Sequence, residues 1–97
     1  MLAERLPAEK ALEWGLVNRV FDDEELMVRT MEIAHRLAKG PRSLALMRKA
    51  YWASPGNAYE QQLELEAKLQ GEAGRSLDRA EGVRAFMEKR DPIFKGE

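Results

Sequence analysis

The sequence predicts an all-α domain of about five helices in an orthogonal-type arrangement. Apolar residues recur every three or four positions in most segments, which is the period of an amphipathic helix. Glycine, proline and small polar residues interrupt the pattern where helices usually begin and end. Only Leu16–Phe21 has a β-like composition. Because this stretch is short and solitary, we expect an extended connector or an edge strand there rather than a sheet.

The first predicted helix lies near the start of the chain. Pro7 suits a first helical turn, because its missing N–H would have no partner there, and good helix formers continue to Trp14. Gly15 follows, where a glycine commonly ends a helix in the left-handed conformation. We therefore expect a helix over residues 7–14.

Two further helices are predicted in the middle of the chain. The first follows Asp22 and Asp23, which can cap its N-terminus, and closes at Lys39 before a Gly-Pro pair. Its apolar face contains Leu26, Met27, Thr30, Met31, Ile33, Ala34, Leu37 and Ala38. The next helix covers residues 42–53. Its apolar stripe is Leu44, Met47 and Tyr51, with Ala50 and Trp52 beside it.

The fourth predicted helix follows a turn at residues 54–57 and runs to about Ala73. Asn57 and Glu60 have the spacing of a capping box, with Asn57 as the N-cap residue. The helix carries two separate apolar stripes, which predict contacts on two sides. One stripe contains Tyr59, Leu63 and Ala67, and the other contains Leu65, Leu69 and Ala73.

The fifth predicted helix covers residues 77–90, with Ser76 as its cap. Asp91 and Pro92 end it, because proline disfavours a helical conformation in the residue before it. Residues 92–97 form a tail. The residues expected to face inward are Ala80, Val83, Phe86 and Met87.

Composition argues against several classes of protein. The 17 acidic and 16 basic residues nearly cancel, which gives no electrostatic signature for binding nucleic acid or anionic lipid. No apolar run approaches the ~20 residues of a membrane span. The chain has no cysteine, which fits a reducing cytosol, so we predict a cytoplasmic protein. Residues 1–6 mix acid and base and do not resemble a signal peptide.

The sequence predicts no catalytic residue and no metal site. His35 lies at the margin of an apolar stripe, where a partly buried or surface histidine is favoured over a ligand or base. Glu60, Glu64 and Glu66 lie on the fourth helix. A solvated face, with Glu64 and Lys68 paired four residues apart, is favoured over an acid/base pair. Glu66 lies between the two apolar stripes, so we mark it as the glutamate for a buried contact.

The last helix gives the best candidate for a ligand site. Phe86 and Lys89 are three residues apart and should share a face, with an aromatic plane beside an ammonium group. Such a pair could stack on an adenine ring and meet a phosphate. From the residues alone, a core phenylalanine and a solvated lysine are the favoured interpretation.

Three motifs occur in order along the chain. They are LPAEKALEWGLVNRV at Leu6–Val20, LAKGPRSLALMRKA at Leu37–Ala50 and SLDRAEGVRAFMEKRDPIFKG at Ser76–Gly96. Together they resemble the enoyl-CoA hydratase/isomerase (crotonase) family over essentially all 97 residues. The last motif resembles the closing Asp–x–x–Glu–Gly–x–x–Ala–Phe–x–x–Lys–Arg–x–Pro–x–Phe signature of that family.

The resemblance implies that residues 1–97 are the C-terminal helical domain of an acyl-CoA enzyme. In this family an N-terminal domain of ββα units supplies the oxyanion hole and the acidic residues, and we expect that domain to be absent here. The helical part packs into trimers, often paired into hexamers, and helps to cover the active site. By position, Phe86 and Lys89 would reach the coenzyme A of a neighbouring subunit. The implied substrate is an acyl-CoA thioester, with no further cofactor.

Within the family, residues 63–86 lean toward phenylacetate-pathway isomerase relatives as well as generic hydratases. The segment Leu77–Arg79 departs from the pattern, in which an aromatic residue commonly follows the aspartate. The leading hypothesis is a domain that is inactive alone. The alternative is a free-standing helical interaction module, and a DNA-binding helical domain is disfavoured by the charge balance.

Overall fold

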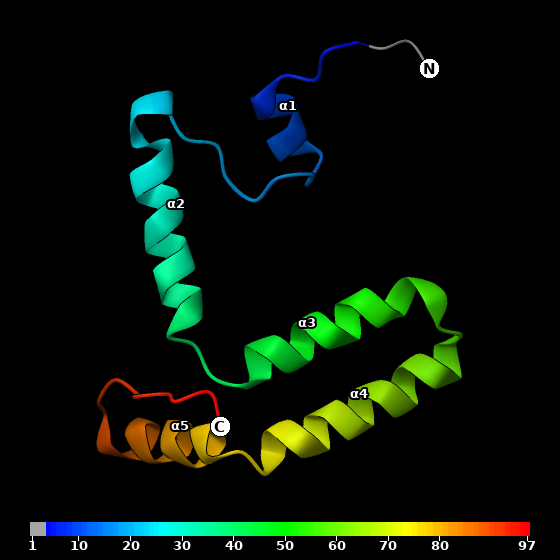
Figure 1. Cartoon of the computed structure of the whole chain (residues 1–97), viewed down its shortest axis with the longest axis vertical. Helices are drawn as coiled ribbons and strands as arrows, with labels where there is room; N and C mark the ends of the chain where they lie inside the picture. The colour runs from blue at the N-terminus through cyan, green and yellow to red at the C-terminus, as the bar shows by residue number, and fades with distance from the viewer. Residues whose placement is uncertain (1–3) are drawn as a thin grey trace. The chain divides into compact units, whose positions relative to one another are not determined.

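The computed structural model describes residues 4–97, and within them the backbone forms five α-helices and one short 3₁₀ turn (Figure 1). The predicted all-α class and helix number are confirmed. The expectation for residues 1–6 falls partly outside the described residues. The elements are α1 (Ala8–Glu13), α2 (Asp23–Ala38), α3 (Ser43–Ala53), η1 (Ser54–Gly56), α4 (Tyr59–Gly74) and α5 (Leu77–Glu88).

The chain divides into two compact units, one ending at His35 and the other covering Arg36–Glu97. In the first unit, α1 ends one residue earlier than expected, and Gly15 terminates it with a φ of +73°. The Gly15 N–H donates to the Leu12 carbonyl (3.0 Å) and the Leu16 N–H to the Ala11 carbonyl (2.9 Å). These two bonds form a Schellman motif, so the predicted helix end at Gly15 is confirmed.

The stretch with β-like composition, Leu16–Phe21, is a connector without strand structure. Within the described residues it has no strand beside it to pair with, so its backbone does not form a ladder. The carbonyl of Asp22 accepts from the N–H groups of Glu25 (3.0 Å) and Leu26 (2.9 Å), and thereby starts α2. None of the residues of α2 is buried, so its apolar face lies at the surface of the chain.

In the second unit, α3 and α4 pack against each other as an antiparallel pair joined by η1 (Figure 1). Leu46 and Leu69 are buried between them, at 9% and 5% exposure. The buried face of α3 therefore lies beside the predicted stripe, because Met47 and Tyr51 are exposed. The guanidinium of Arg48 lies 4.4 Å from the ring centre of Trp52 on this outer surface.

The predicted capping box of α4 is wrong. The N-cap residue is Ala58, and the Oε1 of Gln61 accepts its N–H at 2.9 Å. Asn57 lies one residue too early and has an extended backbone, and its side-chain amide donates to the Oε1 of Gln62 (2.9 Å). No cap bond from the first turn of α4 to the Asn57 side chain is present among the described residues.

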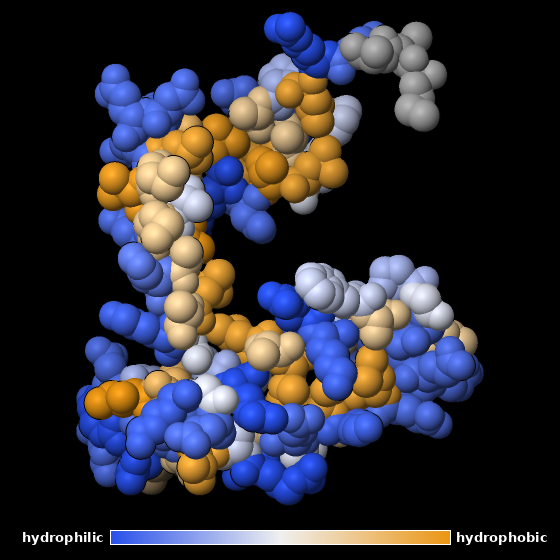
Figure 2. Space-filling view, viewed as in Figure 1, coloured by the Kyte–Doolittle hydropathy of each residue, from blue (hydrophilic) through white to orange (hydrophobic). Residues whose placement is uncertain are grey.

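The two apolar stripes of α4 have different environments. Leu65, Leu69 and Ala73 are buried or half-buried, while Tyr59 and Leu63 are exposed. One stripe therefore packs within the unit and the other has no cover within it. Figure 2 shows hydrophobic side chains gathered at the surface over α3 and α4.

The fifth helix confirms its predicted start and corrects its predicted inner face. The Ser76 hydroxyl accepts from the Arg79 N–H at 3.1 Å, as expected of an N-cap. However, the helix ends at Glu88, two residues early, and the residues expected inside (Ala80, Val83, Phe86 and Met87) are exposed. The buried residues are Asp78 and Ala85. The physical reason is that residues 92–97 fold back along α5 and are bound by its acidic side chains (Figure 1).

The packing predicts unequal effects for two leucines of α4. Leu69→Ala should lower the free energy of unfolding by roughly 2–5 kcal/mol, because it leaves a cavity against Leu46. Leu63→Ala, at an exposed position of the same helix, should cost less than about 1 kcal/mol. Chemical denaturation of both variants measures the difference. Equal losses would contradict this assignment of the core.

Candidate functional site

The carboxylate of Asp78 joins three parts of the second unit at the start of α5. It is 3% exposed and accepts from the backbone N–H groups of Lys95 (2.7 Å), Arg42 (2.8 Å) and Gly96 (2.9 Å). The Asp78 N–H in turn donates to the carbonyl of Glu97 at 2.9 Å. The bond from Lys95, followed by those from Arg42 and Gly96, holds the pKa of Asp78 below its ordinary value. Asp78 is therefore a charged anchor for the α2–α3 connector and the C-terminal tail.

Glu81 binds the same tail one turn later. Its carboxylate accepts from the guanidinium of Arg90 in two bonds (2.6 and 3.1 Å) and from the Ile93 N–H (3.0 Å). Arg84 donates to it from the same helix. Arg90 first, then Arg84 and the Ile93 N–H, hold the pKa of Glu81 far below its ordinary range. Glu81 is therefore ionised at neutral pH.

Gly82 follows Glu81 and lies beside Phe94 of the tail. A Cβ atom at Gly82 would lie 3.6 Å from the ring of Phe94, in van der Waals contact. Asp78, Glu81 and Gly82 thus form one face of α5, which the tail covers. The opposite face has no cover in this unit, and its apolar residues are Leu77, Val83, Phe86 and Met87.

The two predicted ligand residues lie at the C-terminal end of this open surface. Phe86 is 82% exposed, so it is not a core residue of this chain. Lys89 is the residue after the helix, with a φ of +53° and a ψ of +42°. The Lys89 N–H donates to the Phe86 carbonyl (3.3 Å) and the Arg90 N–H to the Ala85 carbonyl (3.1 Å), which is again a Schellman arrangement.

A lysine is an unusual residue for this turn. A left-handed backbone costs a residue with a Cβ roughly 1–2 kcal/mol, and glycine is the common choice. Lys89 is the one non-glycine residue with positive φ in the described chain, and no ion pair neutralises it there. The structure therefore places an exposed ring and an unpaired ammonium at one helix end, without a cation–π contact between them.

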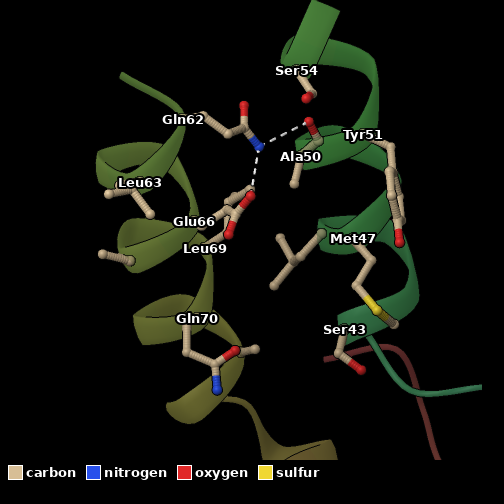
Figure 3. Close-up of a pocket in the computed structure, with 13 residues that line it drawn as sticks. Ser43, Met47, Ala50, Tyr51, Ser54, Gln62, Leu63, Glu66, Leu69 and Gln70 are labelled. Atoms are coloured by element: carbon tan, nitrogen blue, oxygen red, sulfur yellow. Dashed lines mark hydrogen bonds between the residues drawn. The ribbon is translucent and has the colours of Figure 1, made fainter. Parts of the chain in front are cut away.

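A concave surface lies between α3 and α4, apart from the end of α5 (Figure 3). It is a groove of about 610 Å³ with Met47 and Tyr51 on the α3 side and Leu63 on the α4 side. Gln62 crosses it and donates to the Ala50 carbonyl (3.4 Å) and to Glu66 (2.8 Å). The groove brings no acid together with a base, so its geometry supports no catalytic step.

The other candidates from the sequence do not form a site. Glu66 is exposed and bound to Gln62, so the buried contact expected for it is wrong, because the groove at its position is open. His35 and Glu60 are exposed, and Glu64 forms no ion pair with Lys68 among the described residues. In residues 4–97 no group of three potential ligands could hold a metal ion. No described helix has both the length and the apolar composition to cross a membrane.

Sequence reasoning missed Asp78, Glu81 and Arg90 as interacting groups. Two acids three residues apart, next to Gly82, mark one face of a helix as suited to a returning chain. This pattern predicts the contact only when the tail is known to fold back, because Asp78 and Gly96 are 18 residues apart in the sequence.

Comparison with known proteins gives a consistent result. The sequence profile of the enoyl-CoA hydratase/isomerase family matches residues 1–97. The chain is 42% identical over 98 residues to the 1,2-epoxyphenylacetyl-CoA isomerase of Escherichia coli (strain K12), covering 100% of this chain and 37% of the relative. It is also 42% identical over 97 residues to a probable enoyl-CoA hydratase of Rhodobacter capsulatus, covering 99% of this chain and 38% of the relative.

Solved structures agree with these relatives. An enoyl-CoA hydratase/isomerase from Mycobacterium paratuberculosis superposes with a TM-score of 0.87 at 28% identity, over 99% of this chain and 38% of that one. An enoyl-CoA hydratase from Bacillus anthracis gives 0.83 at 32% identity, over 93% and 35%. The chain thus spans just over a third of the length of the proteins that it matches.

The Asp78 anchor predicts a pH-dependent tail. Asp78→Asn should speed hydrogen exchange of the Lys95 and Gly96 amides by about tenfold or more, because charge-assisted bonds become neutral ones. Since folding lowers the pKa of Asp78, its contribution to stability is present above the ordinary value of 3.8 and is lost as pH falls through the folded value.

Amide exchange by NMR and acid denaturation measure these two effects. Asp91→Asn is the matched control, because among the described residues the Asp91 carboxylate accepts no hydrogen bond, and only its backbone carbonyl accepts one, from Arg90. If both variants exchange and acid-unfold alike, Asp78 does not anchor the tail.

Proposed function

The chain belongs to the enoyl-CoA hydratase/isomerase (crotonase) family, and on that premise we propose that residues 1–97 form the C-terminal helical part of an acyl-CoA enzyme. In this proposal the helices assemble trimers or hexamers and help to cover the active site. Phe86 and Lys89 contact the coenzyme A of a neighbouring subunit. The observation that carries the proposal is the family match over residues 1–97 together with the open end of α5.

The chemistry of the described residues supports a non-catalytic role for this part. No acid or base in residues 4–97 lies in a cleft with a partner suited to proton transfer, and the strongly perturbed carboxylates bind backbone and arginine. The groups that hydrate or isomerise an enoyl thioester are then supplied by other parts of the enzyme. The thioester is the substrate, and the proposed reaction needs no further cofactor and takes place in the cytoplasm.

The exposed apolar surfaces support assembly. Val83, Phe86 and Met87 of α5 and Leu63 of α4 are each about half exposed or more within the chain. Contiguous apolar surface on a protein of this size commonly marks a contact with another protein surface. A homo-oligomer of the enzyme would cover these faces, since the cores of homodimer interfaces are similarly apolar.

The end of α5 supports contact with coenzyme A. An exposed aromatic ring can stack on the adenine base, while an unpaired ammonium can meet a phosphate. Neither group is used within the second unit.

A free-standing helical interaction module is the alternative, and the same exposed faces favour it. The coding frame upstream of Met1 discriminates between the two. A continuous frame that encodes a Gly-rich oxyanion-hole sequence supports the enzyme, and a stop codon with a ribosome-binding site just before Met1 supports the module.

A chimaera tests the proposed function directly. Residues 1–97 would replace the matching segment of the probable enoyl-CoA hydratase of Rhodobacter capsulatus. We expect the chimaera to hydrate crotonyl-CoA and the 97-residue chain alone to be inactive. In the chimaera, Lys89→Ala should raise KM for crotonyl-CoA by about tenfold with little change in kcat, because it removes a charged contact to a remote part of the substrate.

Lys68→Ala, at an exposed position of α4, is the control and should leave KM unchanged. Turnover by the isolated chain would refute the non-catalytic role. An unchanged KM in Lys89→Ala would remove Lys89 from the site.

The assembly role predicts self-association of the isolated chain. Light scattering should show oligomers at high concentration, and Met87→Glu should shift them toward monomer, because it introduces a charge on the open face of α5. Arg79→Glu, on the same helix but outside the apolar set, should have little effect. A monomer at every concentration would count against assembly through these faces.

A further inference from the structure

The turn after α5 has the same hydrogen bonds as the turn after α1 but a different residue. Gly15 occupies the left-handed position in the first turn and Lys89 in the second. Glycine adopts this conformation freely, whereas a lysine keeps it only when its surroundings hold it there. The residues that flank Lys89 should therefore be fixed more strongly than those that flank Gly15.

Glu81 supplies this fixation. The residue directly after Lys89, Arg90, makes a bidentate ion pair with Glu81 (2.6 and 3.1 Å). The same carboxylate accepts from the Ile93 N–H at 3.0 Å. Two residues of the returning chain, Arg90 and Ile93, are therefore bound to one glutamate side chain. Only 11% of the Glu81 side chain is exposed, against 36% of the Arg90 side chain.

The charges near the turn leave Lys89 as the group that can meet an anion. Arg84 and Arg90 both pair with Glu81, and Glu88 accepts from the Nε of Arg90 at 2.6 Å, so two carboxylates balance the two arginines. The backbone carbonyl of Asp91 accepts from the Nη1 of Arg90 at 3.0 Å. The arginines are thus committed to the fold, and Lys89 has no partner among the described residues.

We propose that Glu81 is a positioning residue for Lys89: by holding Arg90 and Ile93 it fixes the left-handed turn and directs the ammonium from the helix end that carries Phe86. This role rests on the proposed contact of Phe86 and Lys89 with coenzyme A. Glu81 does not touch the ligand in this arrangement. It acts through the backbone on either side of the lysine.

The test reads the turn in the 97-residue chain labelled with ¹⁵N, and it reads the coenzyme A contact in the chimaera with the Rhodobacter capsulatus relative. In Glu81→Gln, the three-bond coupling between the amide proton and Hα of Lys89, which depends on φ, should change toward the value of an ordinary helical or extended residue. In the chimaera, the same substitution should raise KM for crotonyl-CoA by about tenfold. That is the loss expected when a charged contact is no longer preorganised.

Three further variants make the result specific. Arg90→Gln removes the ion pair but leaves the bond from Ile93 to Glu81, and it should reproduce both effects even if Glu81→Gln fails to fold. Glu72→Gln removes a comparable ion pair with Arg42 in the same unit and should change neither measurement. Lys89→Gly should keep the turn at no conformational cost and raise KM for crotonyl-CoA in the chimaera.

The possible failures are distinguishable. An unchanged Lys89 coupling in both Glu81→Gln and Arg90→Gln would overturn the positioning role, whatever the KM of the chimaera. An unchanged KM for crotonyl-CoA in the Lys89→Ala chimaera would contradict the proposed coenzyme A contact, while the coupling would still decide the role of Glu81.

Discussion

The fold of the second unit depends on the hydrogen bonds that the Asp78 carboxylate accepts from backbone N–H groups. One side chain binds the α2–α3 connector and the C-terminal tail and lies at the start of α5. Among the described residues, the buried apolar ones are Leu46, Leu69 and Ala85. So small a core cannot by itself specify where the tail lies, because apolar burial is non-directional. Charged hydrogen bonds of defined geometry do specify it.

This anchor explains why α5 is oriented with its apolar side outward. A helix that places Asp78 and Glu81 against a returning chain must present the opposite side to the surroundings, since the two faces are fixed to one cylinder. The exposure of Val83, Phe86 and Met87 is therefore a consequence of the polar packing on the other side. The polar contacts within the unit and the exposed apolar side of α5 are two results of one orientation.

The sequence predicted the helices better than their faces. The glycine at position 15 and the serine at position 76 act locally, within a few residues, and both act as expected. The face of α5 was mispredicted because periodicity identifies an apolar stripe but not what covers it. The tail that covers the opposite face is bound through backbone groups, which have no sequence signature. At α4 the predicted cap was one residue too early, because the N-cap residue is Ala58, whose N–H donates to Gln61, while the Asn57 amide donates to Gln62.

The exposed groups of the candidate site could likewise be predicted from the sequence, but the interactions that support them could not. Phe86 and Lys89 could be paired from their spacing, and the chain indeed places both at one exposed helix end. That Lys89 lies outside the helix, in a left-handed turn, does not follow from spacing. The helix ends there because Arg90 turns back to Glu81 nine residues earlier, before the Asp91–Pro92 pair can act.

The lysine at that turn needs a physical explanation, because a glycine would fit the same backbone conformation better. A glycine at position 89 would satisfy the same two backbone bonds with no steric cost, as Gly15 does at the end of α1. The lysine side chain gains nothing within the described chain to offset its backbone, since it forms no ion pair there. A residue that is unfavourable for the turn and unused by the fold is best explained by what its ammonium meets outside the chain. Glu81 and Arg90 pair directly after that unfavourable turn, so the side chains that support the lysine lie apart from its ammonium group.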